Sequence, residues 1–207
     1  MAGRANQSFV VVFVEGETDF QFFTKLLKYY EQNSSSSIRR YKIVQMNGVS
    51  HFTSRVKGKL KGEIIPNAKK KGLKVVAVCC CYDTDVFEFS ERPPVDWKSV
   101  KAIVTSLGIN YFVEVKVDQM IEDWLLDDLE GLCKYLGLET NKSCSSDLPG
   151  KNGYEKMQNL FRRAHKVYLK GNAAKRTLDN LDFVKIRSKR RMRLEALERI
   201  LNVKIQY

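Results

Sequence analysis

Residues Phe9 to Asp19 read Phe-Val-Val-Val-Phe-Val-Glu-Gly-Glu-Thr-Asp and are the most informative stretch of this chain. They form a short, apolar, β-branched run that stops at acidic and turn residues, which is the pattern of a strand buried in a parallel sheet. A second run of this kind covers 74–82 and ends in Asp83-Thr-Asp85. Open α/β sheets bind ligands at the carboxyl ends of their strands, so both runs place carboxylates where a ligand is expected.

Three acidic side chains follow these two strands, namely Glu15, Asp83 and Asp85. A cluster of carboxylate oxygens suits Mg²⁺ or Mn²⁺ far better than zinc. The chain has only two histidines and no Cys-x-x-Cys motif, so a zinc site is not expected. The residues alone therefore predict a magnesium or manganese site at this edge of the sheet.

The rest of the chain alternates between strand and helix signals. Thr18 is placed to cap a helix that follows the first strand. Further strands are predicted at 41–46 and 110–117, and helices at 50–61, 96–107 and 121–136. A lysine-rich turn is expected at 69–71, and further helices at 153–168 and 190–202. This alternation is typical of an α/β fold with a mostly parallel sheet flanked by helices.

The polar, Ser- and Gly-rich stretch at 142–152 marks the expected boundary. We therefore predict an α/β domain at 1–140 and a basic, mainly helical C-terminal region at 150–207 that packs on it. Residues 151–207 hold 16 Lys and Arg against 5 Asp and Glu, so they carry +11 of the net charge of +12. A near-neutral body with a basic C-terminal segment favours a phosphate-binding surface. The basic residues predicted to bind a nucleic-acid backbone are Arg187, Lys189, Arg190, Arg191 and Arg193. The alternative is a solvated helix face.

The apolar runs are too short to span a bilayer, and 9–14 lacks the cleavage site of a signal peptide. Five cysteines, three of them consecutive at 79–81, fit reduced thiols without a disulfide framework. We expect the three consecutive cysteines to fill a buried strand. A cytoplasmic protein without a membrane partner is predicted.

The pair formed by Glu15-Gly16 after one strand and Asp83-x-Asp85 after another resembles the Toprim domain of topoisomerases, bacterial primases, ribonuclease-maturation nucleases and OLD-family nucleases. The resemblance implies a Rossmann-like sheet and a metal site for phosphodiester chemistry formed by Glu15, Asp83 and Asp85. Asp19, one helical turn beyond Glu15, matches an acidic position of that family. It either completes the metal shell or favours the helix N-terminus electrostatically, and the sequence leaves both open.

Two further segments are similar to compact Toprim proteins of the RloB-like group. One is Glu122-Asp123-Trp124-Leu125-Leu126 and the other is Tyr168-Leu169-Lys170-Gly171. The resemblance implies that Glu122 is a further acidic site residue and that Lys170 contacts a phosphate or the transition state. The alternatives are an exposed Glu122 beside a buried Trp124, and an ordinary surface lysine at Lys170.

The resemblance thus implies a divalent-metal-dependent nuclease that acts on DNA or RNA. The chain departs from primases, topoisomerases and OLD proteins because it has no zinc-binding segment, no DNA-gate domain and no Gly-x-x-x-x-Gly-Lys-[Ser/Thr] motif. An ATPase or other partner encoded nearby would have to supply any nucleotide-driven step. The resemblance therefore also implies that the protein is the effector of an anti-phage or toxin-like system. The rival hypothesis is a non-catalytic nucleic-acid-binding or regulatory subunit of a two-component defence complex. A small-molecule phosphotransferase is disfavoured because no nucleotide-binding loop is visible.

Overall fold

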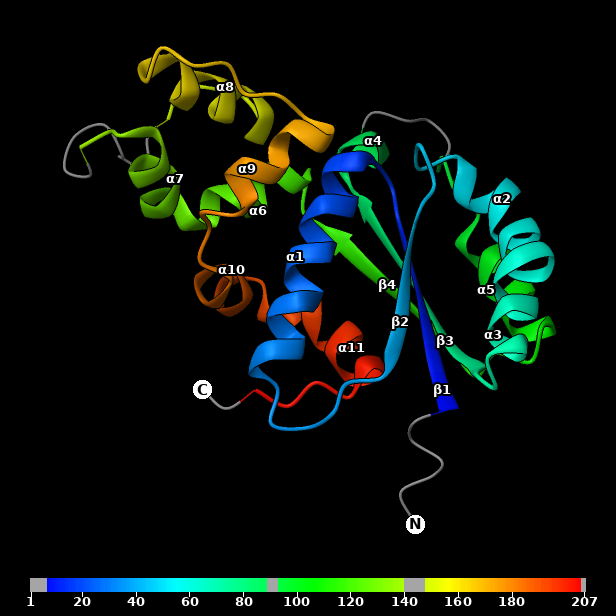
Figure 1. Cartoon of the computed structure of the whole chain (residues 1–207). Helices are drawn as coiled ribbons and strands as arrows, with labels where there is room; N and C mark the ends of the chain where they lie inside the picture. The colour runs from blue at the N-terminus through cyan, green and yellow to red at the C-terminus, as the bar shows by residue number, and fades with distance from the viewer. Residues whose placement is uncertain (1–6, 89–92, 140–147, 206–207) are drawn as a thin grey trace.

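A computed structural model describes residues 7–88, 93–139 and 148–205, and within them the chain folds around one parallel sheet (Figure 1). Its strands are β1 (Ser8–Val14), β2 (Arg40–Gln45), β3 (Lys74–Asp83) and β4 (Tyr111–Val117), in the order β2-β1-β3-β4. Every neighbouring pair is parallel. Because parallel strands need a crossover between them, helices cover the sheet on both faces. The predicted α/β fold class is confirmed.

The helices follow the strands in chain order. Between β1 and β4 they are α1 (Glu17–Asn33), α2 (His51–Lys59), α3 (Ile65–Lys70), α4 (Asp85–Glu88) and α5 (Trp97–Ser106). After β4 they are α6 (Ile121–Leu125), α7 (Leu129–Leu136), α8 (Gly153–Arg163), α9 (Lys175–Leu178), α10 (Phe183–Lys189) and α11 (Arg191–Leu201). The π-turn η2 (Leu60–Ile64) and the 3₁₀ turns η3 (Leu126–Asp128) and η4 (Gly171–Ala174) join some of them.

The sheet separates two hydrophobic cores. Along β1, Val10, Val12 and Val14 face one core, whereas Val11 and Phe13 face the other, because successive side chains of a strand point to opposite faces. On the first face α1 and α11 lie against the sheet, and α6 to α10 extend the same core beside them, whereas α2, α3 and α5 cover the second face (Figure 1). The C-terminal helices thus complete one layer of the fold.

Three helices differ from the sequence-based prediction, and the simplest difference is that the helix expected at 153–168 ends at Arg163. The helix expected at 50–61 continues to Lys70 through η2, so only the end of the expected turn at 69–71 lies outside a helix. Pro66 gives the reason, since its ring clashes with the carbonyl four residues earlier and the chain widens into a π-turn there. The helix expected at 121–136 breaks at Asp128, whose side chain accepts the backbone N–H of Gly131 at 3.1 Å and starts α7 anew.

The prediction for the cysteines is confirmed in part. Cys79, Cys80 and Cys81 are buried free thiols of β3, as expected. Cys133 is disulfide-bonded, which corrects the expectation that every thiol is reduced. Most of the expected boundary at 142–152 lies outside the described residues. Of the helices described here, none combines the length and the apolar character that crossing a bilayer requires.

Candidate active site

A pocket of about 390 Å³ lies at the carboxyl ends of β1 and β3. Figure 1 shows these strand ends pointing toward α4 and the first turn of α1. The loop after β1, the end of β3, α6 and the segment before η4 all contribute to its wall. Its lining includes five of the residues singled out from the sequence, namely Glu15, Asp19, Asp83, Glu122 and Lys170.

Glu15 and Asp83 approach each other across two neighbouring strands. Val14 pairs with Cys81 in the sheet, so the residues that follow them meet at the strand ends. The backbone N–H of Asp83 donates to Glu15 Oε2 at 3.2 Å. Burial raises the pKa of Glu15, and burial followed by the charges of Asp19 and Glu15 raises the pKa of Asp83 well above its ordinary value. Asp83 Oδ1 is buried and has no hydrogen-bond partner.

The two oxygens of Asp19 have different surroundings. Oδ2 accepts the backbone N–H of Gly16 at 3.2 Å, which satisfies a free donor at the start of α1. Oδ1 is buried and has no hydrogen-bond partner. Burial and the charge of Glu15 raise the pKa of Asp19 to about 7. Asp19 therefore takes the N-terminal role that was predicted for Thr18, which lies inside the helix instead.

Asp85 lies beside the pocket. It is the first residue of α4, and its Oδ1 accepts the backbone N–H of Val86 at 2.7 Å. Its negative charge nevertheless contributes to the raised pKa of Glu15. The structure thus brings Asp85 close enough to act on the acidic group electrostatically, but it does not place Asp85 in the pocket lining.

Glu122 is fully buried, which rules out the alternative of an exposed helix residue. Its Oε1 accepts the hydroxyl of Tyr168 at 3.1 Å, and its Oε2 pairs with Lys170 Nζ at 3.3 Å. Trp124, two residues later, is also fully buried, so α6 buries both side chains against different surroundings. Lys170 Nζ also lies 4.6 Å from the centre of the Tyr154 ring, a cation–π distance. Lys170 is therefore positioned directly by two side chains, those of Glu122 and Tyr154.

Sequence reasoning missed two residues that shape this pocket. Tyr168 holds Glu122, and Thr18 Oγ1 accepts the backbone N–H of Gly171 at 2.8 Å. Tyr168 belongs to the Tyr-Leu-Lys-Gly segment that the resemblance singled out, so that segment carried the only available signal. The signal for Thr18 pointed to helix capping, because a contact 153 residues away leaves no trace in a local pattern.

The donor chemistry of the pocket fits a hard divalent cation. Five carboxylates line one small cavity, and the two oxygens without a hydrogen-bond partner belong to Asp19 and Asp83. Such oxygens are costly to bury unless a cation or a proton satisfies them. Among the described residues, however, no group of three or more His, Cys, Asp or Glu side chains already stands close enough to hold a metal ion. Side-chain rotation would therefore have to accompany binding.

The basic run of α10 and α11 is engaged within the protein. Arg187 is buried, and Glu198 binds its guanidinium through Nε at 2.7 Å and Nη2 at 2.9 Å. Arg190 contacts Asp127 and Asp118, and Arg193 Nη2 lies 2.6 Å from Asp118 Oδ1. Lys189 Nζ donates to the backbone carbonyl of Asp127 at 2.8 Å, and Arg191 is exposed. The run thus ties α10 and α11 to the segment from β4 to η3, and its binding of nucleic acid stays a prediction.

Comparison with known proteins gives one structural likeness. No protein-family model matches the chain, and no curated protein matches it. The chain is similar to the solved structure of the C-terminal region of the Xanthomonas campestris pv. campestris OLD protein, with 17% sequence identity and a TM-score of 0.42. The match covers 93% of this chain and 96% of the other.

Proposed function

We propose that this protein is a divalent-metal-dependent nuclease that hydrolyses phosphodiester bonds of DNA or RNA. The observation that carries the proposal is the pair of buried, unpartnered oxygens of Asp19 and Asp83 in the pocket that also holds Lys170. Clustered carboxylates need a cation to offset their mutual repulsion, and a lysine beside them attracts an anionic group. A phosphodiester bound through Mg²⁺ or Mn²⁺ meets both requirements.

In this proposal some side chains of the pocket bind the cation and others bind the phosphate. Glu15, Asp19 and Asp83 supply oxygens that hold the cation, with Asp85 adding negative charge from the start of α4. Bound Mg²⁺ or Mn²⁺ supplies Lewis acidity and lowers the pKa of a water molecule. Lys170, whose side chain is 48% exposed, presents its ammonium group to the phosphate. Glu122 and Tyr168 keep that lysine in place, because Glu122 is anchored through its other oxygen.

The test combines metal binding with cleavage. Calorimetric titration with Mn²⁺ should show binding by the wild type and at least a tenfold weaker affinity for Asp83→Asn, which removes one ligand charge at nearly constant volume. The matched control is Glu195→Gln, because Glu195 is an exposed carboxylate on α11. Cleavage of labelled single- and double-stranded DNA and RNA should require Mn²⁺ or Mg²⁺ and should be lost in Asp83→Asn alone.

Two outcomes would overturn the proposal. Mn²⁺ affinity that is equal in the wild type and Asp83→Asn would remove the metal site. Metal-independent retention of nucleic acid without any cleavage would support the non-catalytic binding subunit instead. We further propose that a separately encoded ATPase or other partner works with this chain in anti-phage defence, which rests on the Toprim resemblance. Co-purification of the tagged protein with the products of neighbouring genes tests that part.

A further inference from the structure

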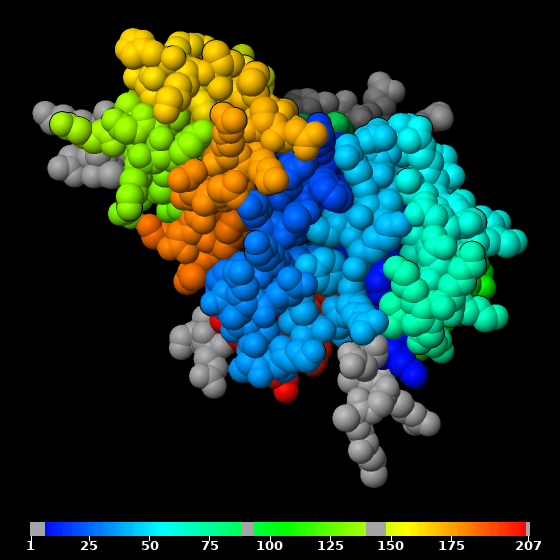
Figure 2. Space-filling view, viewed as in Figure 1, coloured from blue at the N-terminus to red at the C-terminus, as the bar shows by residue number. Residues whose placement is uncertain are grey.

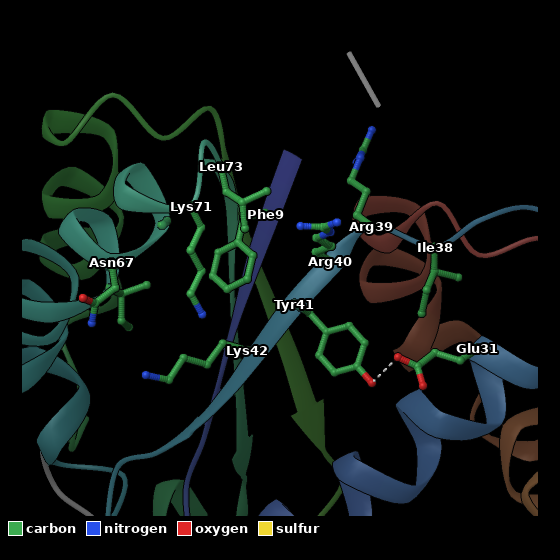
Figure 3. Close-up of a pocket in the computed structure, with 12 residues that line it drawn as sticks. Phe9, Glu31, Ile38, Arg39, Arg40, Tyr41, Lys42, Asn67, Lys71 and Leu73 are labelled. Atoms are coloured by element: carbon green, nitrogen blue, oxygen red, sulfur yellow. Dashed lines mark hydrogen bonds between the residues drawn. The ribbon is translucent and has the colours of Figure 1, made fainter. Parts of the chain in front are cut away.

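A second and larger hollow lies at the opposite end of the sheet. Its volume is about 850 Å³, and it opens where β1 and β2 begin and α3 ends. In Figure 2 it appears between the light blue surface of β2 and the teal surface of α3, with the dark blue of β1 at its floor. Figure 3 shows Arg40 and Lys42 projecting from β2 and Lys71 from the end of α3 around the ring of Phe9.

The charge of this hollow is strongly positive. Its lining contains four cationic side chains and a single carboxylate, Glu31, whose Oε1 accepts the hydroxyl of Tyr41 at 2.9 Å. Lys42 pairs with the exposed Glu63 at 2.6 Å. Arg40 and Lys71 are both exposed, and within the described parts of the chain neither has an acidic partner within 4 Å. Two cations are therefore available to an anionic ligand.

The positive surface continues beyond the hollow itself. Lys69 and Lys70 precede Lys71 at the end of α3 and are exposed, and so is Lys74 at the start of β3. A single phosphate group would engage only part of this surface, whereas a chain of phosphates would engage all of it. The half-buried Phe9 ring on the floor offers an apolar face on which a base can stack.

We propose that this hollow is a binding site for the phosphate backbone of a nucleic-acid chain, with Arg40 and Lys71 as its principal contacts. The inference rests on the proposed function in one respect, because nucleic acid is the ligand that the proposed nuclease must hold. The proposed site for the nucleic-acid backbone differs from the basic run at 187–193 predicted from the sequence. In that run the described contacts join most of the basic side chains to acidic groups of the protein itself. Arg40 and Lys71 form no such pair with the acidic side chains that the structure describes.

The distance between the two sites sets the size of the ligand. β1 has seven residues and runs from the hollow to the pocket, which amounts to about 23 Å at 3.3 Å per residue. Because a duplex that reached both sites would have to follow the protein surface around this buried strand, it would span at least roughly seven base pairs at 3.4 Å each. Shorter nucleic acids would occupy one site at a time and should therefore bind more weakly.

Fluorescence anisotropy with a labelled oligonucleotide of about 20 nucleotides, in buffer with a chelator, tests the proposal without any need for metal or cleavage. The double variant Arg40→Gln/Lys71→Gln should raise Kd about tenfold at moderate salt and reduce the slope of log K against log salt by about 1.4 for a single strand. The matched control is Lys101→Gln/Lys134→Gln, which removes two exposed lysines on α5 and α7 and should leave both quantities unchanged.

Equal Kd values and slopes for the double variant and the control would overturn the proposal. So would the opposite selectivity, in which an acidic peptide or free ADP binds in an Arg40- and Lys71-dependent way while the oligonucleotide does not. Failure of the nuclease proposal gives a different pattern, with oligonucleotide binding that depends on Arg40 and Lys71 but no metal-dependent cleavage by the wild type. Circular dichroism of each variant checks that these exposed substitutions leave the fold intact.

Discussion

The backbone N–H of Gly171 donates a hydrogen bond to Thr18 Oγ1 at 2.8 Å, and this buried contact joins two segments that lie 153 residues apart. Gly171 has a φ of +73°, a conformation that favours glycine. The residue before it, Lys170, is thereby held over the carboxylates that follow β1 and β3. The C-terminal region is thus part of the pocket wall as well as a layer of the fold.

Loss of the Thr18 hydroxyl should therefore destabilise the protein. Thr18→Val keeps the shape of the side chain but leaves the buried N–H of Gly171 without an acceptor, which costs about 1–3 kcal/mol. Urea unfolding measures this cost. The control is Thr24→Val on the exposed side of the same helix, which should change the free energy of unfolding by less than about 0.5 kcal/mol. Equal unfolding midpoints for both variants would contradict the expected role of the contact.

The metal-free protein should lose stability as the pH rises from about 4 to about 7. Burial raises the pKa of Asp19 from 3.8 to about 7, and the pKa values of Glu15 and Asp83 are raised in the same direction. In this range the folded protein binds more protons than the unfolded chain, so its free energy of unfolding decreases with pH and levels off above the folded-state pKa.

Urea unfolding in the presence of a chelator, at several pH values across this range, measures the effect. Asp19→Asn should show a flatter profile, because it removes one of the titrating groups while its side-chain oxygen can still accept the N–H of Gly16. Addition of Mn²⁺ above pH 7 should restore stability to the wild type. A stability that rises steadily from pH 4 to pH 7 would show that the acidic pocket is not repulsive.

Removal of the Glu122 carboxyl group should lower the free energy of unfolding more than its replacement by an amide. Glu122→Ala deprives the buried hydroxyl of Tyr168 of its acceptor and should cost about 1–3 kcal/mol. Glu122→Gln retains an oxygen in that place and should cost less. In the Glu122→Ala background, Tyr168→Phe should recover part of this loss, because it removes the hydroxyl that was left without an acceptor. Additive losses in this double-mutant cycle would show that the two side chains act independently.

Arg187 should be a stability residue. Its guanidinium and the Glu198 carboxylate form a bidentate pair with side chains only 7% and 13% exposed. Arg187→Ala should cost about 3–5 kcal/mol because it leaves a carboxylate in a largely dry environment. Arg199→Ala, at an exposed position of α11, is the control and should be nearly neutral. A variant that keeps wild-type stability but loses oligonucleotide affinity would restore Arg187 to the nucleic-acid-binding role.

The strands could be predicted because each depends on its own composition. The expected strand at 110–117 is β4 at Tyr111–Val117, and the run at 74–82 is β3 at Lys74–Asp83. The carboxyl ends of β1 and β3 lie at the same edge because the two strands are parallel, so the sequence alone could place Glu15 next to Asp83. Local pattern and sheet geometry were sufficient for this half of the pocket.

The other half could not be predicted in the same way. The burial of the Glu122 carboxylate depends on its contacts with Tyr168 and Lys170, which come from a segment without regular secondary structure. Charge counting likewise could not show that Arg187 pairs with Glu198 on the next helix, since a net positive segment does not reveal which arginine meets a carboxylate of the protein itself. Both contacts join side chains from different elements, and the periodicity of a single helix or strand carries no information about them.

The contact between Thr18 and Gly171 also orders events during protein synthesis. At roughly 5–20 residues per second, two positions 153 residues apart are translated about 8–30 s apart. A growing chain therefore carries Glu15 and Asp83 well before it carries Lys170. During that interval the nascent protein holds a cluster of acids without its lysine counterpart, and the finished pocket appears only after residue 171 has left the ribosome.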